Sequence, residues 1–133
     1  LLAKKINIGD VLLLKGDLGT GKTTFSRLVI NSLFERFKIT KPGTINSPSF
    51  PIMINYPMKD CEIFHYDLYR LKDKNELLEV NLFENLEKNI SIIEWPEIII
   101  NNFIFNKYFF FEFEFIDINK RFIKIMHSEK IEL

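Results

Sequence analysis

The sequence predicts an α/β fold with three layers, in which a mainly parallel sheet lies between helices and an antiparallel hairpin follows at the C-terminal end. The parallel part is predicted by three short apolar runs, Val11 to Lys15, Glu62 to Asp67 and Ile90 to Ile93, which read as buried strands. Helical patterns follow the first run and separate the other two. At 133 residues the chain is long enough for one domain, which we expect to span residues 1–133.

The hairpin is predicted from residue 108 onward, where the sequence pattern changes. Phenylalanine and glutamate alternate from Phe111 to Phe115, which is the period-two pattern of a half-buried strand. Asp117 to Lys120 supplies a turn, and Arg121 to Met126 is expected to return as an antiparallel strand. Phenylalanines at this spacing are expected in the core rather than as a stacking platform for nucleobases.

A glycine-rich loop between the first strand and the first helix identifies the kind of α/β fold. It reads Gly16-Asp17-Leu18-Gly19-Thr20-Gly21-Lys22-Thr23 and matches G-x-x-x-x-G-K-[ST], the phosphate-binding loop of nucleotide hydrolases and kinases. In such loops backbone amides converge on a polyphosphate, the lysine reaches the β- and γ-phosphates, and the threonine hydroxyl holds Mg²⁺. The sequence therefore predicts a P-loop NTPase fold. The residues expected to contact the nucleotide are Asp17, Leu18, Gly19, Thr20, Gly21, Lys22, Thr23 and Thr24.

The helix after this loop is predicted to extend to about Phe37. Its apolar residues recur at helical spacing and are Phe25, Leu28, Val29 and Leu33. Its basic residues, with those that follow it, are expected to form a solvated face and are Arg27, Arg36, Lys38 and Lys41. A loop broken by proline and glycine then runs from Thr40 to Pro51, and Ile52 to Tyr56 is a further strand candidate. Asp73 to Glu76 resembles a capping box that opens a second helix.

Two acidic residues end apolar strands and are the candidates for catalysis. P-loop enzymes need a second acid at the C-terminal end of a neighbouring strand to orient Mg²⁺ or the attacking water. Asp67 and Glu94 both occupy such positions, and a parallel sheet would bring both strand ends beside the phosphate loop. We expect at least one of them to be catalytic. His65 should point to the same face as Asp67, and Arg70 is the most plausible arginine near the site.

Composition sets limits on the environment and the partners. Lysine plus arginine and aspartate plus glutamate both number 18, so the net charge is zero and indicates neither a nucleic-acid nor a membrane surface. No apolar run is long enough to cross a bilayer. Cys61 is the single cysteine, and the neighbouring Asp60 and Glu62 should raise the pKa of its thiol. We expect a cytoplasmic protein with no disulfide and no catalytic thiolate.

Several classes of nucleotide-binding protein remain open at this point. Guanine specificity is disfavoured because neither Asn-Lys pair, Asn106-Lys107 or Asn119-Lys120, continues into Asn-Lys-x-Asp. A small-molecule P-loop kinase is the main alternative to an ATPase, although no arginine-rich segment suggests a lid over the phosphates. A third possibility is a nucleotide-binding interaction module without significant hydrolysis.

Four motifs in order resemble one family. They are Gly16 to Arg27, Ser47 to Phe50, His65 to Leu71 and Ile93 to Pro96, and together they closely resemble the TsaE (YjeE) family of small bacterial P-loop ATPases. The resemblance covers about residues 9 to 97. It implies an ATP- and Mg²⁺-dependent ATPase that joins the TsaD–TsaB heterodimer in threonylcarbamoyladenosine (t6A) modification of tRNA adenosine 37. It further implies that tRNA is contacted only through that complex. Because no arginine-rich lid is predicted over the phosphates, we also expect hydrolysis to be slow without a partner.

The resemblance also assigns roles to residues. Lys22 and Thr23 match the family's phosphate loop, and Asp67 matches the acid of its HxDxYR motif. Glu94 matches its second acid, so Thr23 and Glu94 are the expected Mg²⁺-associated residues, and Trp95 matches an aromatic residue next to that acid.

Ser47 to Phe50 matches the family's switch-like loop, with Ser49 where threonine is usual. The family's first strand and helix are expected to be absent or reduced to Leu1 to Ala3. Val80-Asn81 stands where a glycine is often found.

Overall fold

The computed structural model describes residues 2–40, 53–72, 82–100, 107–117 and 120–127. The strands are β1 (Val11–Gly16), β2 (Met53–Pro57), β3 (Glu62–Asp67), β4 (Ile90–Glu94), β5 (Tyr108–Asp117) and β6 (Lys120–His127). The helices are a 3-10 turn η1 (Leu2–Lys4), α1 (Lys22–Arg36), α2 (Leu82–Asn85) and α3 (Glu97–Ile100). None of the helices in the described ranges has the length and apolar character needed to span a membrane.

The described strands form one sheet in the order β2-β3-β4-β1-β5-β6. The four inner strands β3, β4, β1 and β5 run parallel to one another. The two outer strands are antiparallel: β2 pairs with β3, and β6 pairs with β5. The predicted mainly parallel sheet with a C-terminal antiparallel hairpin is therefore confirmed.

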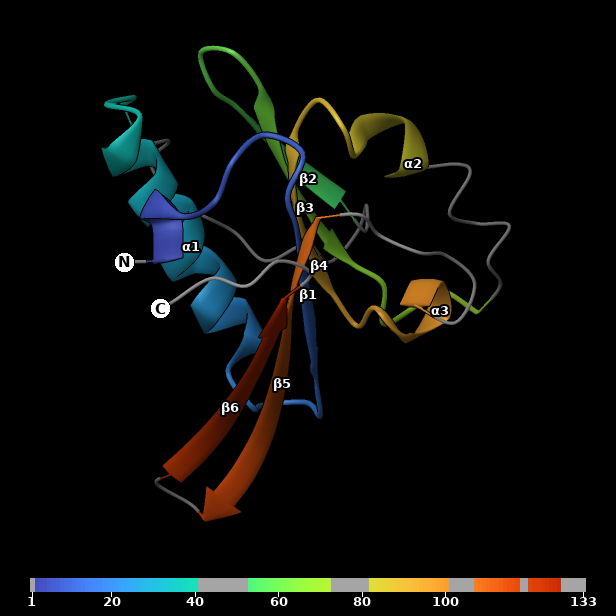
Figure 1. The fold of residues 1–133 in the computed structure, drawn as a ribbon. Coiled ribbons are helices and arrows are strands. Elements are labelled where there is room, and N and C mark those ends of the chain that lie inside the picture. The colour runs from blue at the N-terminus through green and yellow to red at the C-terminus, as the bar shows by residue number, and fades with distance from the viewer. Residues whose placement is uncertain (1, 41–52, 73–81, 101–106, 118–119, 128–133) are drawn as a thin grey trace.

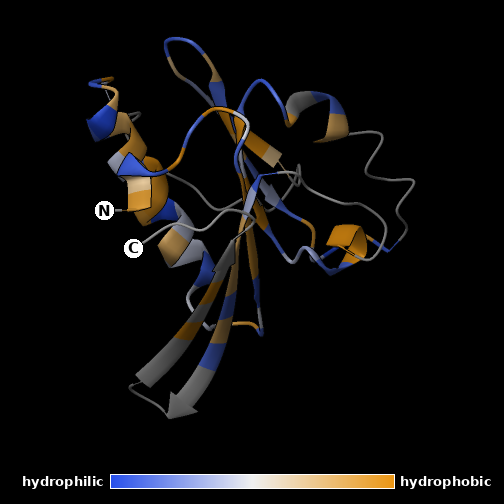
Figure 2. Cartoon of the chain, viewed as in Figure 1, coloured by the Kyte–Doolittle hydropathy of each residue, from blue (hydrophilic) through white to orange (hydrophobic). Residues whose placement is uncertain are grey.

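Helices cover both faces of this sheet, which confirms the three layers (Figure 1). η1 and α1 lie on one face, where the core includes Leu12, Leu14 and Ile30. α2 and α3 lie on the other face, where the core includes Leu13, Tyr66 and Ile93. Hydrophobic residues run along the central strands (Figure 2), because a parallel strand between two helical layers is buried on both sides.

Helix α1 begins at Lys22, directly after the glycine-rich loop, and ends at Arg36, one residue before the predicted end. Its buried apolar residues are Val29, Ile30, Leu33 and Phe34. Leu28 has the helical spacing noted in the sequence but is 62% exposed. Ile30 and Phe34 lie one helical turn apart on the same side as Leu33 and face the sheet.

The hairpin differs from its prediction only in length. β6 begins at Lys120 and ends at His127, one residue beyond the expected strand at each end. On β5, Phe109, Phe111 and Phe113 are buried and Glu114 is exposed, which confirms the alternation over these positions. An irregularity in the β5–β6 register lies between Phe115 and Asp117. The switch-like segment Ser47 to Phe50 and the capping box from Asp73 lie outside the described residues.

Arg36 connects the end of α1 to the N-terminal segment. It is exposed, as predicted, but it is more than part of a solvated face. Its guanidinium donates hydrogen bonds to the backbone carbonyls of Ala3 and Ile6, two buried residues that belong to the core beneath α1. These charge-assisted contacts join η1 and the segment after it to the end of α1.

We predict that Arg36→Met lowers the free energy of unfolding by about 1 kcal/mol, the typical net contribution of such hydrogen bonds. Methionine keeps most of the apolar stem and removes the guanidinium, with its hydrogen bonds and its contact with the Phe37 ring. Urea unfolding followed by circular dichroism measures the change. Arg27→Met is the matched control, since Arg27 is an exposed arginine of the same helix that makes no hydrogen bond to these carbonyls. Equal stabilities of the two variants would contradict the prediction.

Candidate functional site

The sheet topology brings the predicted site residues to one edge. Strands β3, β4 and β1 are adjacent and parallel, so their C-terminal ends meet. Asp67 pairs in register with Glu94, and Glu94 pairs in register with Leu14, two residues before the loop begins. The expectation that both acids lie beside the phosphate loop is therefore confirmed in its geometry.

The glycine-rich loop leads into a helix start that no side chain caps. Gly21 precedes α1 with a φ of 104°, a left-handed conformation that favours glycine, and no side chain caps the helix. Gly16 is also constrained, since a Cβ there would lie 2.8 Å from both the Phe113 carbonyl oxygen and the Thr20 hydroxyl. Free amides at the start of a helix bind anions well. The local geometry suits a phosphate group.

Lys22 lies at the centre of the site and turns back onto the loop. Its ammonium group donates hydrogen bonds to the backbone carbonyls of Gly16 and Asp17, the second at 2.8 Å. The same group lies 4.2 Å from the centroid of the Trp95 ring, a cation–π contact. Burial lowers the pKa of Lys22, and the nearby carboxylates, Glu94 first among them, oppose that shift. An anion bound at the loop would supply the negative charge that this buried ammonium lacks.

The Glu94 side chain has several hydrogen-bond partners and is only 1% exposed. The Thr23 hydroxyl donates to one carboxylate oxygen at 2.8 Å. The other oxygen lies 2.5 Å from Nε2 of His65 and 3.5 Å from the Ser26 hydroxyl. Since a carboxylate accepts, the Nε2–H of His65 is the donor. Buried charge is tolerated only with such partners, so the polar cluster holds Glu94 against the first turn of α1.

His65 and Ser26 are the members of this cluster whose contacts the sequence did not reveal. His65 faces the same side of β3 as Asp67, as predicted, but it is fully buried and contacts Glu94 on the adjacent strand. The sequence signal that could have pointed to this contact was the position of His65, two residues before the strand-end acid Asp67. Ser26 lies one helical turn after Lys22 and is also fully buried, which is an unusual place for serine among apolar helix positions.

Asp67 and Trp95 form the outer side of the site. Asp67 accepts a hydrogen bond from the Tyr69 amide at 3.0 Å, which orients its carboxylate. Burial raises the pKa of Asp67, and the neighbouring Glu94 adds to the increase. Trp95 has a φ of 59°, which is strained for a bulky residue. Its amide donates to the Leu14 carbonyl at 3.1 Å, and its ring packs 4.7 Å from the Tyr69 ring.

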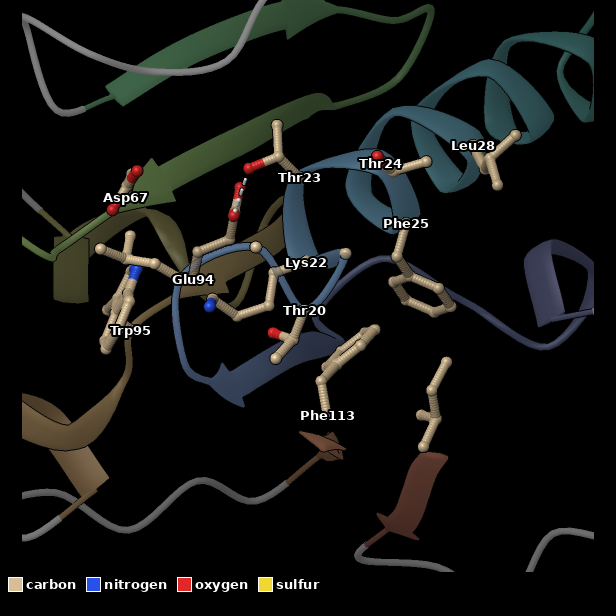
Figure 3. A pocket seen from close by; sticks show the side chains of 14 residues that line it. Thr20, Lys22, Thr23, Thr24, Phe25, Leu28, Asp67, Glu94, Trp95 and Phe113 are labelled. Atoms are coloured by element: carbon tan, nitrogen blue, oxygen red, sulfur yellow. Dashed lines mark hydrogen bonds between the residues drawn. The ribbon is translucent and has the colours of Figure 1, made fainter. Parts of the chain in front are cut away.

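A cavity of about 570 Å³ joins these elements. Figure 3 shows Asp67, Glu94 and Trp95 on one side of Lys22, and Phe25 and Phe113 on the other. Every predicted site residue lines the cavity except Asp17, whose carbonyl accepts from Lys22 and Thr20. Four apolar residues that line the cavity were not predicted as site residues: Phe25, Leu28, Phe113 and Ile123.

The donor set fits a magnesium ion better than a transition metal. Within the described ranges no group of three or more histidine, cysteine, aspartate or glutamate residues could hold a metal by itself. The adjacent Thr23 and Glu94 side chains offer two oxygen ligands. Mg²⁺ in nucleotide sites is bound by one or two such ligands, by phosphates and by water. Cys61 is remote from this chemistry, since it does not line the cavity and burial raises the pKa of its thiol, with Asp60 and Glu62 adding to the increase.

Comparison with known proteins assigns this arrangement to a family. The family model described as "Threonylcarbamoyl adenosine biosynthesis protein TsaE" matches residues 1–123. The chain belongs to the TsaE family. This confirms the resemblance drawn from the four motifs and connects the family to threonylcarbamoyladenosine biosynthesis.

Individual relatives agree with this assignment. The tRNA threonylcarbamoyladenosine biosynthesis protein TsaE of Rickettsia conorii is 37% identical over 130 residues, covering 98% of this chain and 71% of that protein. The TsaE of Bacillus subtilis is 36% identical over 91 residues, covering 68% of this chain and 53% of that protein. Among solved structures, the crystal structure of YdiB of Bacillus subtilis matches with a TM-score of 0.65 and 25% identity, covering 94% of this chain and 72% of that one.

The raised pKa of Asp67 has a consequence for stability. Folding strengthens proton binding by this carboxyl, so the folded state loses stability as pH rises from the ordinary carboxyl pKa through the raised one. Asp67→Asn removes the charged form. We predict that this variant, without nucleotide, melts a few degrees above the wild type at pH 7 and that the gain disappears below the ordinary carboxyl pKa. Thermal melting across pH measures it, with the exposed Asp60→Asn as control; a lower melting temperature at pH 7 would contradict it.

Proposed function

We propose that this chain is an ATP-binding and ATP-hydrolysing accessory protein that acts with TsaD and TsaB in t6A modification of tRNA adenosine 37. In this proposal residues 1–133 form one P-loop ATPase domain in the cytoplasm, and tRNA is reached only through the partner proteins. The membership of the TsaE family supports the pathway. The site supports the nucleotide chemistry.

The observation that carries the ATPase proposal is the contact between Thr23 and Glu94. The Thr23 hydroxyl lies 2.8 Å from the Glu94 carboxylate, where the first turn of α1 meets the C-terminal end of β4. A hydroxyl after the loop lysine and an acid on a neighbouring strand are the two protein groups that P-loop NTPases use around Mg²⁺. When bound, Mg²⁺ would neutralise developing charge on the β- and γ-phosphates. Thr23 and Glu94 would hold it.

The remaining residues have complementary tasks. Lys22 would exchange the Gly16 and Asp17 carbonyls for phosphate oxygens, which would favour its charged form over the neutral form that burial favours. Asp67 faces the same cavity, and its raised pKa makes it a stronger base than an ordinary aspartate. We assign to Asp67 the orientation of the attacking water.

The same site explains why hydrolysis would be slow without a partner. No arginine is found among the described residues that line the cavity. Leu18 and Leu28 at its rim are each 62% exposed, so water has access to a bound nucleotide. Stabilisation of transition-state charge is weak where water screens it, and related NTPases receive an arginine from a partner. The proposal therefore includes closure of the site by TsaD–TsaB.

Hydrolysis assays with and without the purified TsaD–TsaB pair test the proposal. We predict slow hydrolysis by the chain alone and clear stimulation by the pair. Lys22→Ala should weaken ATP binding by about tenfold to a hundredfold, the equivalent of one lost charge-assisted hydrogen bond, and should abolish stimulation. Lys15→Ala is the control, because Lys15 precedes the loop without lining the cavity. Fast hydrolysis that ignores the partners would contradict the proposal, and stoichiometric phosphate transfer to a small acceptor would favour a kinase.

A further inference from the structure

His65 is a polar side chain that lies behind the proposed metal site. It is fully buried, and it is not among the described residues that line the cavity. It is therefore not placed to touch a nucleotide in that cavity, and any influence on the chemistry has to pass through a neighbouring side chain. That neighbour is Glu94, whose Oε2 lies 2.5 Å from Nε2 of His65.

The register of the sheet sets this contact. His65 pairs with Ile92 of β4, and Glu94 follows Ile92 by two residues, so all three side chains lie on the same face of the sheet. This is the face that α1 covers, because Ile92 belongs to the core beneath that helix. Long side chains can reach their diagonal neighbours on an adjacent strand. Strand pairing therefore brings His65 and Glu94 together.

The hydrogen bonds of His65 indicate a neutral imidazole with its proton on Nε2. Glu94 accepts the hydrogen bond from this Nε2–H. Nδ1 has no hydrogen-bond partner in the part of the chain that the structure describes. A second proton on Nδ1 would be a buried donor without an acceptor, which is costly. A neutral His65 orients the carboxylate and leaves its negative charge available to a cation.

The two oxygens of Glu94 have different partners. Oε2 faces His65, and the Ser26 hydroxyl, 3.5 Å away, also donates to the Lys22 carbonyl at 2.9 Å. Oε1 accepts from the Thr23 hydroxyl at 2.8 Å, the contact drawn in Figure 3. Because the hydrogen of Thr23 is directed at Glu94, the Thr23 oxygen keeps its lone pairs for another partner. A cation is such a partner.

We infer that His65 is a positioning residue for the metal: its Nε2–H fixes the Glu94 carboxylate, which in turn fixes the Thr23 hydroxyl with its lone pairs available to a magnesium ion. The inference rests on the proposed nucleotide function and deepens it. Removing a partner that orients a metal-binding group typically weakens metal binding by about tenfold to a hundredfold. His65 thus affects nucleotide affinity through Mg²⁺ and not through the nucleotide itself.

Binding of ADP by isothermal titration calorimetry, in Mg²⁺ and in EDTA, tests this role in two matched variants. ADP is used because it has no γ-phosphate to hydrolyse. His65→Gln places an amide N–H near the position of Nε2, whereas the shorter side chain of His65→Asn does not reach Glu94. We expect Mg²⁺ to tighten ADP binding to the wild type and to His65→Gln to a similar extent. In His65→Asn the tightening should fall by about tenfold or more, with the affinity in EDTA unchanged.

Arg36→Met is the control for lost stability, because its hydrogen bonds lie at the other end of α1, away from the cavity. We expect it to melt at a lower temperature than the wild type and to keep the full effect of Mg²⁺. If His65→Asn does not fold, His65→Met takes its place, since it fills the same space without a donor.

Three results would overturn the inference and leave nucleotide binding intact. They are a full Mg²⁺ effect in His65→Asn, an equal loss of that effect in His65→Gln, and an equal loss in Arg36→Met. Failure of the wild type to bind ADP would instead overturn the proposed function together with the inference.

Discussion

The buried carboxylate of Glu94 is the interaction on which the rest of the site depends. It lies at the end of β4, between β1 and β3, and is 1% exposed. A charge removed from water is costly unless donors surround it, and here Thr23, Ser26 and His65 lie around it. The same contacts join the first turn of α1 to two strands of the sheet. One cluster thus fixes the phosphate loop in space and retains an acid next to the Thr23 hydroxyl.

Next to this cluster, the ammonium group of Lys22 is bound to carbonyls of the phosphate loop, and a bound anion could take the place of those carbonyls. Lys22 is satisfied by carbonyls of its own loop and by the Trp95 ring. Trp95 holds its position through a strained backbone, with a φ of 59° and a hydrogen bond to the end of β1. Strain of this kind persists where the surrounding structure enforces it, and it occurs often at functional sites. Nucleotide binding would therefore exchange internal contacts of Lys22 for phosphate contacts, while the cluster behind it keeps its geometry.

The sequence predicted the frame of this molecule better than its details. The loop motif and the strand-end acids Asp67 and Glu94 followed from local patterns, because a parallel sheet places strand ends together. The burial of His65 against Glu94 did not follow, since contact between side chains on adjacent strands depends on register. The exposure of Leu28 could not be predicted, because helical spacing alone does not say which of several apolar residues turn toward the sheet. Arg36 was read as a solvated residue, and only the position of η1 shows its hydrogen bonds.

The dependence of ATP affinity on Mg²⁺ in the wild type and in Glu94→Gln tests the central claim most directly. Glutamine preserves the shape and can still accept from Thr23, but it lacks the charge that a cation requires. The account predicts that Mg²⁺ tightens ATP binding to the wild type and that Glu94→Gln loses most of this tightening while retaining ATP binding without Mg²⁺. An equal effect of Mg²⁺ on both proteins would show that Glu94 is a structural tether and not part of the metal site.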